Sequence, residues 1–174
     1  MSPVAHAGIG LLGWQMFDKK KTIATLIAYI TAANFADVDF LFYKLIGPKP
    51  LFIHQYYTHN LIFALLIGVL LALLLPRGAS RWGIVLTSFS HLALDIIVID
   101  TMKPIGMRLL FPLSNAYYNV GFFPFLRRGS WKVMTSPHNL QVLGIELACF
   151  VLPILLIYRR PLFRRLSSAA FWRL

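Results

Sequence analysis

WGIVLTSFSHLALDIIVID, residues 82–100, is an apolar segment long enough to cross a bilayer, yet it contains His91 and Asp95. Four residues apart, these two side chains lie on one face of a helix. A charged group at the centre of a membrane helix costs at least ~2.5–3.5 kcal/mol, so it needs a partner, a cavity or a metal. The pair is therefore the first candidate functional site, with an internal ion pair as the main alternative.

The composition of the whole chain is that of an integral membrane protein. Of its 174 residues, 58% are hydrophobic and 13% are charged, whereas soluble domains carry about 25% charged residues. The formal net charge is +11, but the basic residues form short clusters between apolar segments, as cytoplasmic loops do under the positive-inside rule. We therefore expect contact with anionic phospholipids at the cytoplasmic face and no binding of nucleic acid.

Five apolar segments predict an all-α, polytopic membrane protein with about five membrane segments, the first of them short. A helix that crosses a bilayer needs ~20 residues. The first segment is shorter than that and rich in glycine, which allows close helix packing. We expect a membrane-embedded domain over residues 1–160 and a basic amphipathic cytoplasmic tail over residues 161–174. The segments are residues 3–17, 22–46, 60–76, 82–100 and 140–158.

The ionisable residues gather on one side of the predicted membrane domain. If all five segments cross, the basic clusters at 18–21, 76–81 and 158–165 share one face, which the positive-inside rule makes cytoplasmic. Depth along each helix follows from ~1.5 Å of rise per residue. On this scale every histidine and every acidic residue except Asp18 falls in the outer half or its loops. A functional site facing the non-cytoplasmic side is therefore expected.

The residue types indicate a metal site. Imidazoles mixed with carboxylates are ligands of zinc, manganese or iron, whereas magnesium and calcium prefer oxygen ligands alone. We expect a divalent metal, with zinc as the first choice and manganese as the alternative. Such a cation lowers the pKa of a bound water and polarises the bond to be cut. The candidate ligands are His6, Asp37, Asp39, His54, His59, His91, Asp95 and His138.

Some of these assignments stay open at the level of the sequence. Asp37 and Asp39 are ~200° apart on an ideal helix, so both face one centre only if the helix ends there. Either His54 or His59 can instead belong to an aromatic belt at the membrane interface. The candidate general base is Glu146 or an aspartate left without a metal bond, such as Asp39.

Arginines of the long loop at 101–137 are candidate contacts for a substrate phosphate, because a guanidinium group suits that geometry. Arg108 is the first choice, since it is close in sequence to the outer end of the 82–100 segment. Arg127 and Arg128 are further candidates.

Five short motifs support a family resemblance: HAGIG (6–10), ADVD (36–39), HQYYTH (54–59), HLALD (91–95) and GMRLLFP (106–112). In this order they resemble the YdjM-like family of bacterial inner-membrane proteins, described as membrane-bound metal-dependent hydrolases. The resemblance covers most of residues 1–160 and implies a multi-pass protein of the bacterial inner membrane. The family usually has His-Arg followed by Thr-His-Ser, where this chain has His54-Gln55 and Thr58-His59-Asn60.

The order of candidate ligands is also loosely similar to that of zinc-dependent phospholipase C and its related nucleases. Those helical enzymes hold a cluster of zinc ions and cleave phosphodiesters. The similarity implies phosphoester chemistry, although the family's final histidine and acid are four residues apart while His138 and Glu146 are eight apart. The N-terminal tryptophan that coordinates metal in those enzymes is absent here.

Taken together, these features predict a membrane-bound metal-dependent hydrolase acting on a phosphoester of a lipid or lipid-linked substrate. A metal-ion or proton transporter is one alternative, because it also has His and Asp inside the bilayer. A non-catalytic membrane scaffold with a structural metal site is another. A structural zinc site is closed, whereas a catalytic one keeps a position for water.

Overall fold

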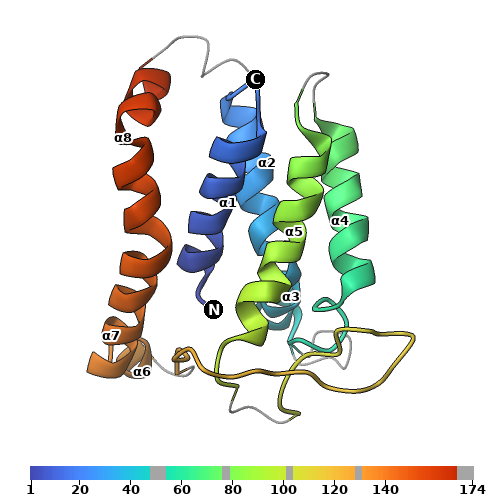
Figure 1. Cartoon of the computed structure of the whole chain (residues 1–174). Coiled ribbons are helices and arrows are strands. Elements are labelled where there is room, and N and C mark those ends of the chain that lie inside the picture. Colours follow the sequence, from blue (N-terminus) through green and yellow to red (C-terminus); the bar gives the residue numbers. More distant parts are fainter. Residues whose placement is uncertain (48–53, 76–78, 101–103, 128–130, 168–174) are drawn as a thin grey trace.

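The computed structural model describes residues 1–47, 54–75, 79–100, 104–127 and 131–167 (Figure 1). Within these ranges the regular elements are all helices, which confirms the all-α prediction. In chain order they are α1 (Pro3–Phe17), α2 (Ile23–Asn34), the 3-10 turn η1 (Phe35–Asp37), α3 (Val38–Ile46), α4 (Leu61–Leu74), α5 (Arg81–Ile96), α6 (Trp131–Met134), α7 (Pro137–Glu146), the π-helical segment η3 (Leu147–Val151) and α8 (Leu152–Leu166).

Short polar residues determine where most of these helices begin. In each case the side-chain oxygen accepts a hydrogen bond from a backbone N–H of the first turn, which otherwise lacks a partner. Proline follows the cap in α1 and α7, where its missing N–H has no cost. The caps are Ser2, Thr22, Asn60, Ser80 and Ser136.

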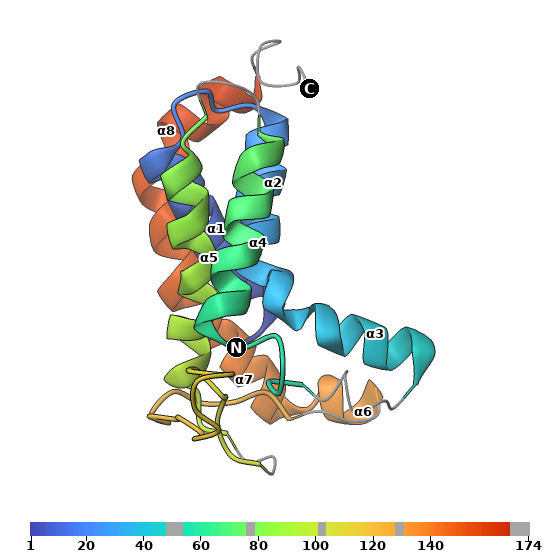
Figure 2. The same cartoon turned by 90° about the vertical axis from the view of Figure 1, so that its right-hand side faces the viewer.

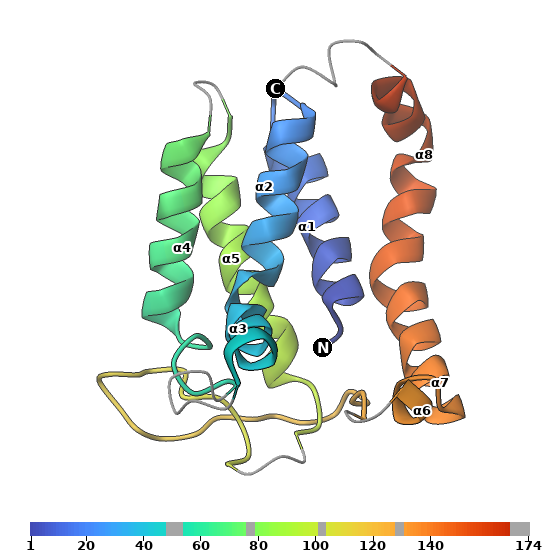
Figure 3. The same ribbon diagram turned by 180° about the vertical axis from the view of Figure 1, so that it is seen from behind.

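Helices α1, α2, α4 and α5 form a bundle, and α8 stands beside α1 (Figures 1 and 3). Helix α3 leaves the bundle at a steep angle after η1 (Figure 2). The N-terminus, η1, the C-terminal end of α5 and the loop at 104–127 all lie at the same end of the bundle (Figures 1 and 3). This end carries the candidate site.

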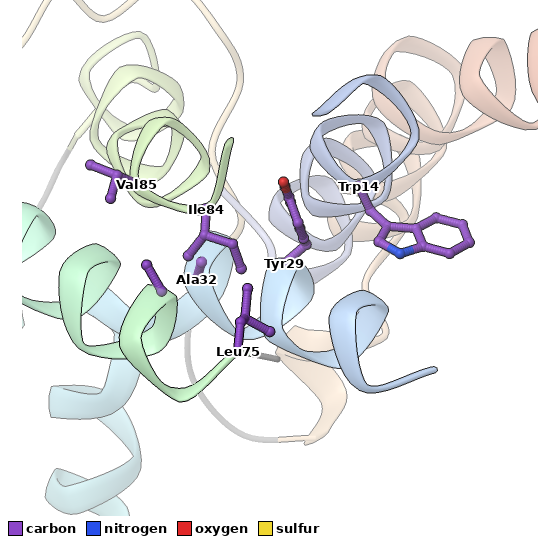
Figure 4. Close-up of a cluster of buried hydrophobic side chains, with 7 residues drawn as sticks. Trp14, Tyr29, Ala32, Leu75, Ile84 and Val85 are labelled. Carbon is purple, nitrogen blue, oxygen red and sulfur yellow. The ribbon is translucent and has the colours of Figure 1, made fainter. Parts of the chain in front are cut away.

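Apolar side chains fill the other end of the bundle (Figure 4). Trp14 of α1, Tyr29 of α2 and Ile84 of α5 are fully buried there. Close helix packing makes this possible: a Cβ at Gly10 would lie 2.9 Å from the Ile30 Cα and 2.9 Å from the Tyr29 carbonyl oxygen. The glycine-rich first segment therefore does pack closely, as predicted.

Asp18 is the one acidic residue at this apolar end, and it is buried. Its carboxylate accepts hydrogen bonds from the Lys21 backbone N–H at 2.6 Å and the Thr25 hydroxyl at 2.8 Å. Thr25 in turn accepts a hydrogen bond from the Trp14 indole N–H at 3.0 Å. Asp18 thus joins α1 to α2 and has no part in the candidate site.

Two continuous helical stretches in the described residues are long and apolar enough to cross a membrane. They are Ile23–Tyr43, which runs from α2 through η1 into α3, and Pro137–Arg159, which runs from α7 through η3 into α8. This is fewer than the five or so that the sequence predicts. Helices α1, α4 and α5 contain 15, 14 and 16 residues; at ~1.5 Å per residue they span about 21–24 Å, short of a ~30 Å hydrocarbon core. Capping and turn residues end these helices earlier than their apolar composition suggests.

The predicted boundary at residue 160 lies inside α8, which continues to Leu166. Residues 168–174 of the predicted cytoplasmic tail lie outside the described residues. The basic amphipathic tail over 161–174 therefore stays a prediction.

Candidate metal centre

Four residues at one end of the bundle form the candidate metal centre. Asp37 of η1, His59 of the loop before α4, and His91 and Asp95 of α5 each offer one ligand atom, and these atoms all lie within 4.8 Å of one another. The side chains of His59, His91 and Asp95 are at most 3% exposed, whereas that of Asp37 is 22% exposed. The group is thus enclosed on most sides and reached by solvent at Asp37.

The closest approaches in this group are between atoms that can bind a cation. The Nε2 atoms of His59 and His91 are 3.1 Å apart. The Asp95 Oδ2 atom lies 3.2 Å from the His91 Nε2 and 3.3 Å from the His59 Nε2. The Asp37 Oδ1 atom lies 3.6 Å from the His59 Nε2 and 3.8 Å from the His91 Nε2. Two imidazole nitrogens and two carboxylate oxygens therefore converge on one point.

Hydrogen bonds at the other ring nitrogens assign the tautomers of both histidines. The His91 Nδ1–H donates to the Ala33 carbonyl at 2.8 Å. The Thr58 hydroxyl donates to the Asp39 carboxylate at 2.6 Å, so at 2.9 Å it must accept the hydrogen bond from the His59 Nδ1–H. In the neutral form of each ring, the Nε2 atom then has a lone pair directed at the centre.

Two lone pairs only 3.1 Å apart cannot hydrogen-bond to each other. A proton or a metal cation between these nitrogens and the carboxylates satisfies them. Burial alone would lower the pKa of His59, but hydrogen bonds to Asp37 and Asp95 raise it to about 9. The centre therefore attracts positive charge strongly, and its donor set of nitrogen and oxygen atoms fits a zinc or manganese ion.

His6 of α1 lies directly against this group. It is fully buried, and its ring stacks on that of His91 with the centroids 3.9 Å apart. The His6 Nε2 is 3.2 Å from the Asp95 Oδ1, and neither ring nitrogen is assigned a hydrogen-bond partner in the described residues. The α-ammonium group of Met1 also contacts the Asp95 Oδ1. A buried imidazole without hydrogen bonds is a further potential ligand.

Asp39 lies behind His59 and not in the four-residue group. Its carboxylate accepts hydrogen bonds from the His54 Nδ1–H at 3.0 Å, the Gln55 N–H at 3.1 Å and the Thr58 hydroxyl at 2.6 Å, and from the Phe40 N–H. Asp39, His54 and His59 also form a second possible ligand group. With four donors on its two oxygens, however, the Asp39 carboxylate acts as the anchor of the 54–59 loop.

The break after α2 explains how both aspartates contribute. Helix α2 ends at Asn34, the 3-10 turn η1 contains Asp37, and α3 begins a new direction at Val38. The ~200° separation of an ideal helix therefore does not apply. Asp37 faces His59 Nε2 and Asp39 faces the other side of the same ring.

The sequence profile of the YdjM inner membrane protein family matches residues 1–163. The chain belongs to the YdjM inner membrane protein family. The resemblance seen in the short motifs is confirmed, and the family name indicates the inner membrane. No curated protein and no solved structure matches the chain.

In this YdjM family protein, two further predicted site residues belong to α7 and also lie outside the four-residue group. The His138 Nε2–H donates to the Phe125 carbonyl at 3.0 Å. Glu146 is buried, and its carboxylate accepts hydrogen bonds from the N–H and hydroxyl of Ser2. The depth predicted for His138 and Glu146 matches that of the metal centre. Both residues, however, belong to α7, which lies beside α1 on the side away from α5. Depth along a helix does not define lateral position.

Of the three arginines predicted as phosphate contacts, Arg108 has the most developed surroundings. Its guanidinium carbon lies 4.4 Å from the centroid of the Tyr56 ring and 4.1 Å from that of Phe111. The residue is buried, it donates a hydrogen bond to Asn115, and its Nε has no partner in the described residues. This is a buried cation with an unused donor.

The other two arginines are less defined. Arg127 is exposed, and its backbone is tied to Asn139 of α7 by two hydrogen bonds of 2.8 Å. Arg128 lies outside the described residues.

Sequence reasoning missed Thr58 and Ser2, which hold a candidate ligand and a candidate base. Both are small hydroxyl residues next to a motif residue or a helix start, and this pattern is too common to mark a site by itself. The signal that could have identified Thr58 is its position directly before the candidate ligand His59.

Proposed function

We propose that this YdjM family protein is a membrane-bound metal-dependent hydrolase that cleaves a phosphoester of a lipid or lipid-linked substrate. The observation that carries the proposal is the pair of Nε2 lone pairs of His59 and His91, 3.1 Å apart and flanked by two carboxylates. A buried arrangement of this kind is costly unless a cation occupies it.

Asp37, His59, His91 and Asp95 would hold the metal, zinc in the first instance or manganese, with His6 as a further ligand. When bound, the cation supplies a water of lowered pKa and polarises the phosphoester. The protein residues fix the ligands: Ala33 orients His91, and Thr58 orients His59. Neither histidine needs to reorient when a metal binds.

Asp37 is proposed to hold the metal through one carboxylate oxygen and to orient the attacking water and accept its proton through the other. It is the most exposed of the four site residues, so water and substrate can reach it. Asp39 and Glu146 were the candidate bases from the sequence, but both oxygens of each carboxylate already accept hydrogen bonds from protein donors. We assign them to positioning.

Arg108 is proposed to bind the substrate phosphate. The segment that carries it packs on the loop that carries His59: the Leu61 N–H donates to the Leu109 carbonyl at 3.0 Å, and the Tyr57 and Phe111 rings are in contact. The unused Nε donor provides the hydrogen bond, and the two flanking aromatic rings keep the guanidinium in place.

The shape of the bundle favours an enzyme over a transporter. The histidines and every acidic residue except Asp18 occupy one end, while Trp14, Tyr29 and Ile84 form an apolar cluster at the other end. A transport path would need polar residues along the whole bundle. The partial exposure of Asp37 favours an enzyme over a structural metal site, because a structural site is closed.

The test combines metal content with hydrolysis. Detergent-purified wild type, His91→Ala and Asp95→Ala are analysed for bound zinc and manganese, and each is assayed by phosphorus NMR on phospholipids that differ in headgroup. Asp18→Asn is the matched control, because Asp18 is also a buried carboxylate but lies at the other end of the bundle.

We expect metal and activity in wild type and the control, and loss of both in the two site variants. Full metal occupancy in both site variants would refute the proposed centre. Metal loss in the variants, without turnover of any lipid by wild type, would favour the transporter or the scaffold.

A further inference from the structure

Glu146, the last residue of α7, is a buried carboxylate that contacts the start of the chain. It is 1% exposed. The Ser2 N–H donates to its Oε1 at 3.1 Å, and the Ser2 hydroxyl donates to its Oε2. Removing a carboxylate from water costs several kcal/mol unless hydrogen bonds replace the water. Here both carboxylate oxygens of Glu146 accept hydrogen bonds from the same residue, Ser2.

Ser2 is also the N-cap of α1. Its hydroxyl oxygen accepts a hydrogen bond from the Ala5 N–H at 3.4 Å, and its carbonyl accepts one from the His6 N–H at 3.3 Å. The residue that Glu146 holds is therefore the residue on which the first helical turn is built. His6 completes that turn and carries its ring to His91 and Asp95.

A second contact fixes α1 against the same long helix. A Cβ at Gly8 would lie 2.7 Å from the Phe150 carbonyl oxygen, so only glycine allows this approach. Phe150 belongs to the π-helical segment η3, which begins directly after Glu146. Helices α7 and α8 stand beside α1 and away from α4 (Figures 1 and 3). The contacts of Glu146 with Ser2 and of Phe150 with Gly8 therefore connect these helices to the metal centre through α1.

From this geometry we infer that Glu146 is a positioning residue for the metal centre, acting through Ser2 and the first turn of α1 on His6. The inference rests on the proposed metal binding. According to this inference, α7 contributes to the metal centre although it provides no metal ligand. Neither ring nitrogen of His6 has a hydrogen-bond partner in the described residues, so the backbone of this turn and the packing on His91 position the ring.

The experiment is a double-mutant cycle on zinc affinity, measured by competition with a chromophoric chelator in detergent. The proteins are wild type, Glu146→Gln, His6→Ala and the double variant. Glutamine keeps the shape of the side chain but turns one acceptor into a donor that opposes the Ser2 donors. Residues that orient metal ligands typically contribute 10–100-fold to affinity, so we expect about a 10-fold or larger loss in Glu146→Gln. In the His6→Ala background the same substitution should have no further effect.

Two variants separate positioning from general loss of stability. Asp18→Asn weakens α1 at its other end, where Asp18 holds Lys21 and Thr25. It should lower the unfolding temperature and leave zinc affinity unchanged. Ser2→Ala removes the hydroxyl that connects Glu146 to the first turn of α1, and it should lower zinc affinity as Glu146→Gln does. This variant tests the inference independently if Glu146→Gln folds poorly.

The outcomes are distinct. Unchanged zinc affinity in both Glu146→Gln and Ser2→Ala would overturn the inference while the proposed centre stands. An equal loss in the wild-type and His6→Ala backgrounds would overturn action through His6. Absence of zinc binding by wild type would instead overturn the proposed function on which the inference depends.

Discussion

The orientation of single imidazole rings determines what the candidate centre can bind. The partner of His91 is a backbone carbonyl, which side-chain substitution cannot remove. The partner of His59 is the Thr58 hydroxyl, whose own hydrogen is committed to Asp39. The chain of hydrogen bonds from Asp39 through Thr58 to His59 is thus the part of the centre that mutation can test.

Thr58→Val keeps the shape of the side chain and removes the hydroxyl. His59 then loses the acceptor that fixes its tautomer, and Asp39 loses a donor. We expect a roughly 10–100-fold loss of zinc affinity and a loss of about 1–3 kcal/mol in the free energy of unfolding. Chelator competition and thermal unfolding measure the two effects. Thr58→Ser retains the hydroxyl and should behave like wild type; an identical loss in both variants would contradict the hydrogen-bond explanation.

Arg108→Lys tests the phosphate contact. Lysine keeps the charge but loses the planar donors and the stacking between Tyr56 and Phe111. We expect kcat/KM for phosphoester hydrolysis to fall by about 10²-fold, the scale of one lost transition-state donor, with zinc content unchanged. Activity equal to that of wild type would exclude Arg108 as the phosphate ligand. Arg81→Lys, on an exposed side chain at the start of α5 and away from the centre, is the control.

At the scale of the helices, the apolar pattern allowed the sequence to predict the helical class and the approximate segments. The pattern did not reveal the 3-10 turn at Phe35–Asp37, because a change of direction leaves apolar composition unaltered. The choice between Asp37 and Asp39 depends on that turn. His138 was assigned by its depth and by the order of the candidate ligands, and neither contains the side of the bundle on which α7 packs, which is a tertiary property.

Helix packing gives a prediction of its own at Gly10. An alanine there would bring Cβ to 2.9 Å from the Ile30 Cα and the Tyr29 carbonyl oxygen, both backbone atoms that cannot rotate away. We expect Gly10→Ala to lower the free energy of unfolding by about 1–3 kcal/mol, as overpacking does. The control is Gly144→Ala in α7, where a Cβ meets no atom within 4 Å. It should be neutral or slightly stabilising in the same thermal unfolding assay in detergent.

At the scale of the whole molecule, the two ends of the bundle differ in chemistry and should face different compartments. Lys20 is exposed at the end that carries the apolar cluster, and Ala116 is exposed at the end that carries the centre. By the positive-inside rule we expect the Lys20 end to be cytoplasmic and the centre to face the opposite compartment.

Cysteine labelling in intact spheroplasts tests this orientation. The chain has one cysteine, Cys149, so Cys149→Ser provides the background for Lys20→Cys and Ala116→Cys. A membrane-impermeant maleimide should label Ala116→Cys in intact cells and label Lys20→Cys after lysis. The reverse pattern would reverse the topology and bring the centre to the cytoplasm.

The short helices have a consequence for the surrounding lipid. Helices of 14 to 16 residues fall several ångström short of a ~30 Å hydrocarbon core, which produces hydrophobic mismatch. If these helices cross the bilayer, thinning of the lipid around them is one way to relieve the mismatch, and thinning would draw headgroups inward. A centre at the end of a short bundle would then lie closer to the phosphates of the leaflet, and we expect bilayers of shorter acyl chains to accommodate the protein at a lower free-energy cost.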